Sequence, residues 1–308
     1  MEGAPKREGE RKGSAMKLLF RVFFMVLVVH TNAGASGDFK NTRLFDVARG
    51  KEVTLANALT TLKEKRLIFV GEQHDQKSHH RVQLLIVRSL HESAVPVAIG
   101  LEMFRGEDQA VLDRWVNDEI KPGAFQRIYQ DNWNFPWPLY RMIFEYAKDQ
   151  GIPLVGLNIR RTITGQVARK GFQSLSPQQR GELPNVVCDV DEDYMAFIKR
   201  AYGAHAHGHL IFTHFCEAQL VWDNVMAINA LRYLDAHPEY VMVLLAGSGQ
   251  AWKRGIPEQI GRRSQISYAV ILPHTPEKIH PGAVTEEDAD YIIFGPSPHV
   301  SDQNQSDP

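Results

Sequence analysis

Six short runs of apolar residues recur along the chain, and each has the length and composition of a buried β-strand. The runs are Leu67–Val70, Val97–Leu101, Pro153–Leu157, Tyr240–Ala246, Ile266–Leu272 and Tyr291–Phe294. Such runs are typical of a sheet that is covered on both faces. They therefore predict six buried strands.

Between most of these runs lie segments whose apolar residues are spaced three and four positions apart, as on one face of an amphipathic helix. The longest, from about Phe215 to Leu234, carries a broad apolar stripe. Ser176 before Pro177 predicts a helix N-terminus, because serine caps well and proline suits the first helical turn. Strands that alternate with helices predict an α/β domain with a mostly parallel central sheet flanked by helices.

The same pattern divides the chain into one domain, an insertion and a tail. The span from Ile159 to Leu210 contains no convincing strand and is predicted as a helical insertion. No internal repeat is found, so a single domain is expected for residues 36–294. Residues 295–308 are polar and proline-rich, and this composition predicts a disordered tail.

Residues 1–35 have the organisation of a secretory signal peptide. Basic residues precede the apolar run Leu18–Val29, and residues 33–35, Ala-Gly-Ala, have the small-x-small form of a signal peptidase site. Arg21 interrupts the run, which is also shorter than the ~20 apolar residues of a transmembrane helix. An uncleaved anchor is the alternative. No cysteine lies near the cleavage region, so no lipid anchor is expected there.

Composition and charge limit the classes of function and partner that the sequence predicts. The 308 residues are 44% hydrophobic and 23% charged, an ordinary globular composition. The formal net charge is −1, so no basic field indicates a nucleic-acid partner. Export would place Cys188 and Cys216 in an oxidising compartment, but the sequence does not decide whether they pair.

Groups able to bind a proton, a metal or a ligand follow five of the predicted strands where each one ends. They are Glu72, His74 and Asp75 after the first, Glu102 after the second, Asn158 after the third, Gln250 after the fourth and His274 after the fifth. In open α/β sheets ligands bind outside the carboxyl ends of the strands. The pattern predicts a ligand site at this edge; the alternative is that polar residues are simply common in loops.

Five blocks of sequence together carry a family resemblance. They are GEQHDQKSHH, LEMF, VGLN, EAQLVWDNVMA and LLAGSGQAWKRGIPEQI, and the match runs from about Phe69 to Leu272. In this order they resemble the ChaN-like family of the haem-binding uptake and Tiki superfamily, which also contains erythromycin esterases. The resemblance implies an exported α/β protein that binds haem. For the hydrolase branches it also implies a site made of two Gly-x-x-His motifs and an acidic residue.

Those hydrolase motifs map onto this sequence with one departure. The first is Gly71–His74, the acidic residue is Glu102, and the second is Gly247–Gln250, where glutamine replaces the histidine. Glutamine does not titrate, and it competes poorly with imidazole for a first-row metal. Glu72, His74 and Glu102 form the alternative catalytic set of a hydrolase, with His74 and Glu102 as candidate ligands of a divalent metal. A structural role, as a hydrogen-bonded polar network that orders the sheet end, or a ligand-contacting role is favoured over catalysis.

Two segments supply candidate axial ligands for haem iron. The aromatic segment Arg127–Arg141 contains Tyr129 and Tyr140, and tyrosine is one of the residues that ligate haem. Its two prolines, Pro136 and Pro138, are expected to exclude a regular helix. The alternative is a loop that its own aromatic side chains hold in place.

The second segment follows Tyr202 and alternates histidine with small residues. Its candidate ligands are His205, His207 and His209. The alternative is a glycine-containing loop with solvated histidines. His79 and His80, at the start of the helix after the first strand, are expected to be exposed.

The sequence thus predicts a soluble, exported protein, periplasmic or secreted, that binds haem or another iron-bearing small molecule and takes part in haem or iron uptake. Nucleic acid is not an expected partner, and a homodimer is left open. The rival prediction is the hydrolase, with or without a metal.

The organisation of the N-terminus yields a first test. Mature protein recovered from the periplasm should begin near Ser36, because small residues precede it at the positions that the peptidase recognises. N-terminal sequencing checks this directly. Recovery of protein that still contains Leu18–Val29 would show an uncleaved anchor instead.

Overall fold

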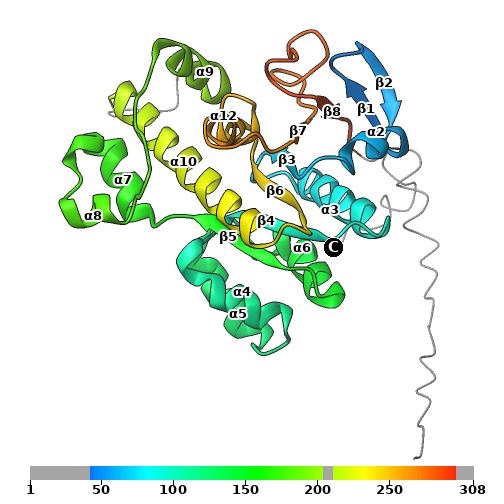
Figure 1. Cartoon of the computed structure of the whole chain (residues 1–308), viewed down its shortest axis with the longest axis horizontal. Coiled ribbons are helices and arrows are strands. Elements are labelled where there is room, and N and C mark those ends of the chain that lie inside the picture. The colour runs from blue at the N-terminus through cyan, green and yellow to red at the C-terminus, as the bar shows by residue number, and fades with distance from the viewer. Residues whose placement is uncertain (1–41, 204–210, 296–308) are drawn as a thin grey trace, which may run out of the picture. The chain divides into compact units, whose positions relative to one another are not determined.

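The computed structural model describes residues 42–203 and 211–295 of the chain. Eight strands form one sheet (Figure 1). They are β1 (Arg43–Asp46), β2 (Lys51–Thr54), β3 (Leu67–Glu72), β4 (Val97–Arg105), β5 (Leu154–Asn158), β6 (Val241–Gly247), β7 (Tyr268–Pro273) and β8 (Tyr291–Ile293). Their order in the sheet is β2-β1-β8-β7-β3-β6-β4-β5. The predicted signal peptide, and all but the first residue of the predicted tail, lie outside the described residues.

The sheet is mostly parallel, as predicted. Strands β8, β7, β3, β6, β4 and β5 pair in parallel, whereas β1 is antiparallel to both of its neighbours. All six predicted runs form strands, within a few residues at either end. The β1–β2 hairpin was not predicted, because β2 is only four residues long and no residue in it is fully buried.

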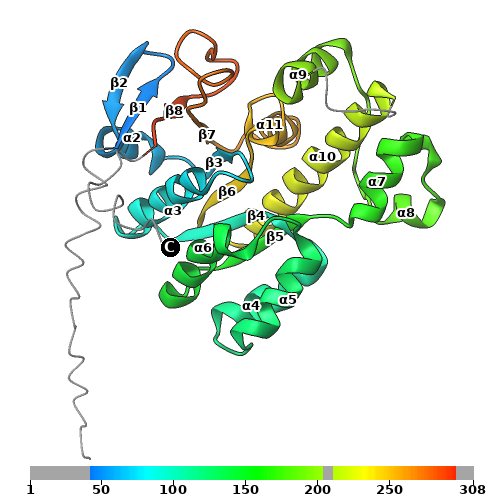
Figure 2. The same cartoon turned by 180° about the vertical axis from the view of Figure 1, so that it is seen from behind.

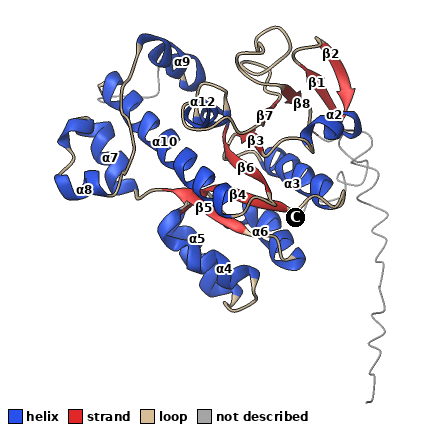
Figure 3. Ribbon diagram, viewed as in Figure 1, coloured by secondary structure: helices blue, strands red, loops and turns tan. Residues whose placement is uncertain are grey.

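Side chains of the central strands alternate between two faces, and each face has its own core. In β3, Ile68 and Val70 belong to one core, whereas Leu67 and Phe69 belong to the other. Helices cover both faces of the sheet (Figures 2 and 3). The first core is closed by α2 (Leu55–Leu62), α3 (Lys77–His91), α4 (Gln109–Val116), α5 (Pro122–Asn132) and α6 (Trp137–Gln150). The second is closed by α9 (Glu192–Tyr202), α10 (Phe212–Ala236), α11 (Ser248–Ala251) and α12 (Ile256–Gly261).

The insertion is helical in its described part, residues 159–203. It contains α7 (Arg161–Lys170), α8 (Pro177–Gly181) and α9, and Ser176 caps α8 in a reciprocal capping box with Gln179. A third, smaller apolar cluster joins α7 to α10 through Ile163, Val167 and Val221. In the two described ranges no helix is both long and apolar enough to cross a membrane.

The expectation that prolines exclude a regular helix is wrong for most of the aromatic segment. Helix α5 ends at Asn132 and α6 begins at Trp137, so only four residues between them are non-helical. Pro136 occupies the N-cap of α6, and Pro138 lies in its first turn. Proline is tolerated there because the first N–H groups of a helix have no partner within the helix.

A side chain takes the place of a neighbouring strand at the sheet edge formed by β5. Gln109 Nε2 donates to the Leu154 carbonyl at 2.7 Å, and Gln109 Oε1 accepts from the Gly156 N–H at 3.0 Å. These two backbone groups flank Val155, so the amide pairs as a residue opposite Val155 in a parallel strand would. Nearer the end of β5, Asn229 of α10 donates to the Leu157 carbonyl at 2.8 Å.

Replacement of this amide should destabilise the edge. Gln109→Ala removes two hydrogen bonds to β5, so the free energy of unfolding should fall by about 1–3 kcal/mol in urea titrations followed by circular dichroism. Gln130→Ala, at an exposed position of α5, is the matched control and should change it by less than about 0.5 kcal/mol. Equal effects of the two substitutions would mean that water replaces the Gln109 amide without cost.

Candidate functional site

Four neighbouring strands bring the predicted polar residues to one edge of the sheet. Glu72 ends β3 directly beside Gly247, the last residue of β6. Glu102 lies in strand β4, three residues before its end, and Asn158 ends β5. The side chain of Asn158 donates to the Glu102 carbonyl at 2.7 Å. The predicted ligand edge is therefore assembled from β3, β6, β4 and β5.

A buried carboxylate organises this edge. Glu72 Oε1 lies 2.7 Å from His74 Nδ1 and accepts from the Tyr140 hydroxyl at 2.5 Å. Glu72 Oε2 lies 3.1 Å from His80 Nε2. An ionised carboxylate can only accept, so Nδ1 of His74 carries the proton that it donates. This leaves Nε2 as the ring nitrogen of His74 that is available to a ligand.

The expectation that His79 and His80 are exposed is wrong. Helix α3 turns both rings inward: His80 is fully buried against the Tyr140 ring, with centroids 4.0 Å apart. His79 accepts from the Gln73 N–H at 2.9 Å. Sequence position alone suggested a solvated helix start, but the buried charge of Glu72 gives these imidazoles polar partners inside the fold.

Burial and hydrogen bonding oppose each other at the Glu72–His74 pair. Burial alone would raise the pKa of Glu72, but the hydrogen bonds and charges of His74 and His80 lower it to about 2. Burial alone would lower the pKa of His74, but the hydrogen bond to Glu72 and the charges of Glu102, Glu72 and Asp75 raise it to about 9. The pair is therefore an imidazolium–carboxylate pair at neutral pH.

The second carboxyl group, Glu102, has a different environment. It is buried, and its Oε2 accepts from the Gly247 N–H at 2.7 Å. Burial raises its pKa, and the nearby charge of His74 and the Gly247 hydrogen bond only partly oppose this. Gly247 itself leaves no room for a side chain, because a Cβ there would lie 2.9 Å from Cε1 of His74. Glycine at this position is what allows His74 and Glu102 to approach the same strand end.

A cavity of about 410 Å³ opens beside His74 and Glu102. Its volume lies in the range of small-molecule and cofactor sites, about 300–1,000 Å³. Aromatic side chains from two helices, α9 and α10, and from the α5–α6 connection form its apolar walls: Trp133, Phe135, Tyr202, Phe215 and Trp222. Its polar lining comes from His74, Glu102, Asn158, Arg161, Gln219 and Gln250. The His74 ring packs against Trp133 and Phe135, with centroids 5.0 and 4.9 Å apart.

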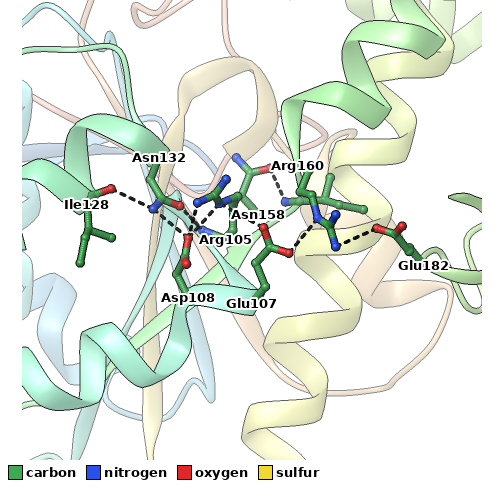
Figure 4. A network of polar contacts seen from close by, with 9 residues as sticks. Arg105, Glu107, Asp108, Ile128, Asn132, Asn158, Arg160 and Glu182 are labelled. Carbon is green, nitrogen blue, oxygen red and sulfur yellow. Dashed lines mark hydrogen bonds and ion pairs between the residues drawn. The ribbon is translucent and has the colours of Figure 1, made fainter.

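Two other cavities adjoin the site. One of about 180 Å³ shares His74, Tyr202 and Gln250 with the aromatic cavity and reaches Lys278. The other is a larger groove of about 730 Å³ between β5, α4 and α10. Several charged side chains of the groove pair with one another, as Figure 4 shows for Arg160 and Glu182, and it lacks the aromatic walls of the site. The smaller aromatic cavity is therefore the candidate binding site.

Of the remaining predicted ligand residues, two line the aromatic cavity and one does not. Asn158 and Gln250 line the aromatic cavity with Glu102 and His74. His274 does not line it; its ring packs against Phe294, with centroids 5.2 Å apart. The strand-end rule placed His274 correctly at the end of β7, but β7 lies on the far side of β3 from the cavity.

The predicted tyrosine ligands are core residues. Both Tyr129 and Tyr140 are fully buried, with hydroxyls that donate to the Phe135 carbonyl and to Glu72. Burial, reinforced by the charge of Glu72, raises the pKa of both phenols, which disfavours the phenolate that binds ferric haem. Neither lines the aromatic cavity. His205, His207 and His209 lie outside the described residues.

No group of three or more His, Cys, Asp or Glu side chains in the described ranges is arranged to hold a metal ion. The proposed divalent-metal pair His74 and Glu102 thus lacks a third ligand of these types there. Cys188 and Cys216 are free thiols, and burial raises the pKa of each, to about 12 and about 11.

Two cavity residues were missed by sequence reasoning. Arg161 lies three residues after the end of β5. It would have been found if the strand-end rule had been extended past Asn158. Trp222 is not among the predicted ligand residues, yet it lines the cavity, and its indole N–H has no hydrogen-bond partner among the described residues. No local signal distinguishes such a tryptophan from a core residue.

Comparisons with known proteins place the chain in a family. The sequence matches the family described as haem-binding uptake, Tiki superfamily, ChaN, over residues 58–260. No curated protein matches the chain. Among solved structures, the one described as cofacial haem binding to ChaN of Campylobacter jejuni aligns with a TM-score of 0.64 at 19% identity. The alignment covers 83% of this chain and 97% of that one, and it shows a common fold.

Two further solved structures are more remote. An erythromycin esterase mutant, EreC in its open conformation, aligns with a TM-score of 0.46 at 16% identity over 79% of each chain. A type III effector aligns with a TM-score of 0.47 at 15% identity over 78% of this chain and 92% of that one. Neither likeness is strong enough to bear on function.

The Glu72–His74 pair predicts a measurable titration. In NMR pH titrations the pKa of His74 should be about 9, and Glu72→Gln should lower it, because the strongest stabilising contact of the imidazolium is lost. Asp75→Asn, which removes only a nearby charge, should lower it less. The folded-state pKa exceeds the ordinary value of 6.5, so the stability that His74 contributes is fully present below pH 6.5 and is lost as pH rises through 9. An unchanged pKa in Glu72→Gln would contradict this account.

Proposed function

Because the chain belongs to the haem-binding uptake, Tiki superfamily, ChaN family, we propose that it binds haem in the aromatic cavity beside His74. The observation that supports this location is the chemistry of the side chains that line the cavity. A porphyrin has two large apolar faces and an anionic edge. The cavity offers aromatic walls together with the cationic groups His74 and Arg161.

The residues present fit such a ligand. Burial of apolar surface contributes about 2.5 kcal/mol for each ~100 Å² before the costs of association, so contact of the macrocycle with these aromatic rings supports binding. The indole N–H of Trp222 is buried and has no partner within the described ranges, and it would gain an acceptor from a ligand carboxylate or from water that accompanies it. His74, protonated at neutral pH, suits an anionic group better than a metal.

The axial ligand is proposed to come from His205, His207 or His209. These residues follow Tyr202, which lines the cavity, by only a few positions. Imidazole is a common haem ligand, and these histidines suit the role better than Tyr129 and Tyr140. Bis-histidine, single-histidine and tyrosinate ligation give different absorption spectra, so substitution of each histidine by alanine would identify the ligand.

The biological setting is proposed from the sequence. With the predicted signal peptide, the protein would act outside the cytoplasm in the uptake or handling of haem. The C. jejuni protein is described as binding haem cofacially. Light scattering of this chain with and without haemin would test whether a homodimer accompanies binding here.

The alternative function is that of a hydrolase, and the observation that favours it is the Glu72–His74 hydrogen bond. Catalysis would require His74 to exchange protons near neutral pH, but its raised pKa holds it in the cationic form. If haemin gave no saturable spectral change, while a test ester or peptide were hydrolysed and His74→Ala abolished the hydrolysis, the rival would replace the proposal.

Haem binding should depend on the aromatic wall. Phe135→Ala removes one wall of the cavity and should weaken haemin binding about tenfold, measured as the midpoint of the Soret shift in absorption titrations. Phe172→Ala is the matched control, because Phe172 is half-buried outside the cavity, and it should leave the midpoint unchanged. Equal titrations for the wild type and Phe135→Ala would move the haem site away from this cavity.

A further inference from the structure

One cation on the cavity wall has no carboxylate partner. Arg161 is the first residue of α7 and lines both the aromatic cavity and a neighbouring hollow of about 150 Å³. Its guanidinium carbon lies 5.6 Å from the centre of the Trp133 ring, on the face of the indole. Within the described ranges no carboxylate lies within ion-pair distance of it.

The neighbouring arginines differ in this respect. Arg160, the preceding residue, contacts Glu107 at 2.8 Å and Glu182 at 3.4 Å (Figure 4). Arg105 of β4 contacts Asp108 at 2.6 Å. Carboxylates therefore already neutralise the arginines that face the groove, whereas the arginine that faces the aromatic cavity has only an aromatic ring.

The surroundings of Arg161 favour an anion. Burial lowers its pKa, which means that the guanidinium has lost part of its contact with water. Among the described residues that line the cavity, Glu102 is the one with a carboxyl group, and its own pKa is raised, so its negative charge is weakened. A guanidinium that is partly removed from water and lacks a counter-charge gains more from an incoming carboxylate than a solvated one does.

We propose that Arg161 is the residue that selects ligands by their carboxylate: it binds a propionate of haem while the porphyrin face packs against the aromatic wall that includes Trp133. This inference rests on the proposed function and adds to it the group that is recognised. The planar guanidinium presents paired N–H donors that match the two oxygens of a carboxylate. The indole beneath holds the guanidinium in place before the ligand arrives, which reduces the ordering cost of binding.

The test varies the ligand and the protein together. Haemin is compared with haemin dimethyl ester, in which both propionates are esterified and uncharged. Wild-type protein should bind haemin at least about tenfold more tightly than the ester. Arg161→Met, which removes the charge but keeps an unbranched apolar stem, should weaken haemin binding by about the same factor and leave ester binding unchanged. Arg161→Lys, which restores a point charge without the planar fork, should recover part of the loss.

Arg160→Met is the matched control, because it removes an adjacent arginine that is already paired with carboxylates. It should leave the titrations with both ligands unchanged. The comparison of the two ligands on wild-type protein needs no substitution, so it holds even if a variant folds poorly; thermal unfolding reports on that separately.

Three outcomes would overturn the inference. Equal binding of haemin and its ester by wild-type protein would mean that no carboxylate is recognised. Equal weakening of both ligands by Arg161→Met would mean that the arginine contributes packing alone. Equal loss in Arg160→Met and Arg161→Met would assign the effect to general positive charge. Absence of saturable binding of either ligand would instead refute haem binding itself.

Discussion

The buried charge of Glu72 is the constraint on which the ligand edge depends. A carboxylate removed from water requires polar partners, and here they come from the β3–α3 loop, α3 and α6. His74, His80 and Tyr140 therefore cannot move independently. Contacts with this one carboxylate fix the ring orientation of His74 and orient the start of α3 toward the core. They also anchor the aromatic segment that forms a wall of the cavity.

Charged side chains are arranged differently on the two sides of this sheet edge. On the side of the groove between β5, α4 and α10, opposite charges neutralise one another and hold α7 and α8 to the end of β4. On the side of the aromatic cavity, the cations His74 and Arg161 face a carboxyl group whose ionisation is suppressed. The carboxylates beside the groove thus pair with arginines that hold the fold together, whereas positive charge remains beside the apolar walls of the cavity. This combination of charge and apolar surface is what an amphipathic anion requires.

The sequence predicted those parts of the fold that depend on local pattern. The strands of the central sheet appear as apolar runs, and the strand-end rule brought Glu72, His74, Glu102 and Asn158 to one edge because parallel strands end together. It failed for His274, since strand order is decided by packing between distant segments. Tyr140 could not be recognised as a partner of Glu72 for the same reason, because α6 is far from Glu72 in sequence and only the folded chain brings them together. His80 is close to Glu72 in sequence, but packing of the folded chain decides which face of α3 turns inward.

The amide of Gln109 has a consequence beyond the stability of β5. An exposed edge strand is a template on which another chain can add a strand, and such addition leads to aggregation or domain exchange. Here the side chain of Gln109 already occupies the Leu154 carbonyl and the Gly156 N–H of that template. A foreign strand would have to displace both hydrogen bonds before it could pair with β5 around Val155, so one amide of a neighbouring helix protects this edge against intermolecular β-pairing.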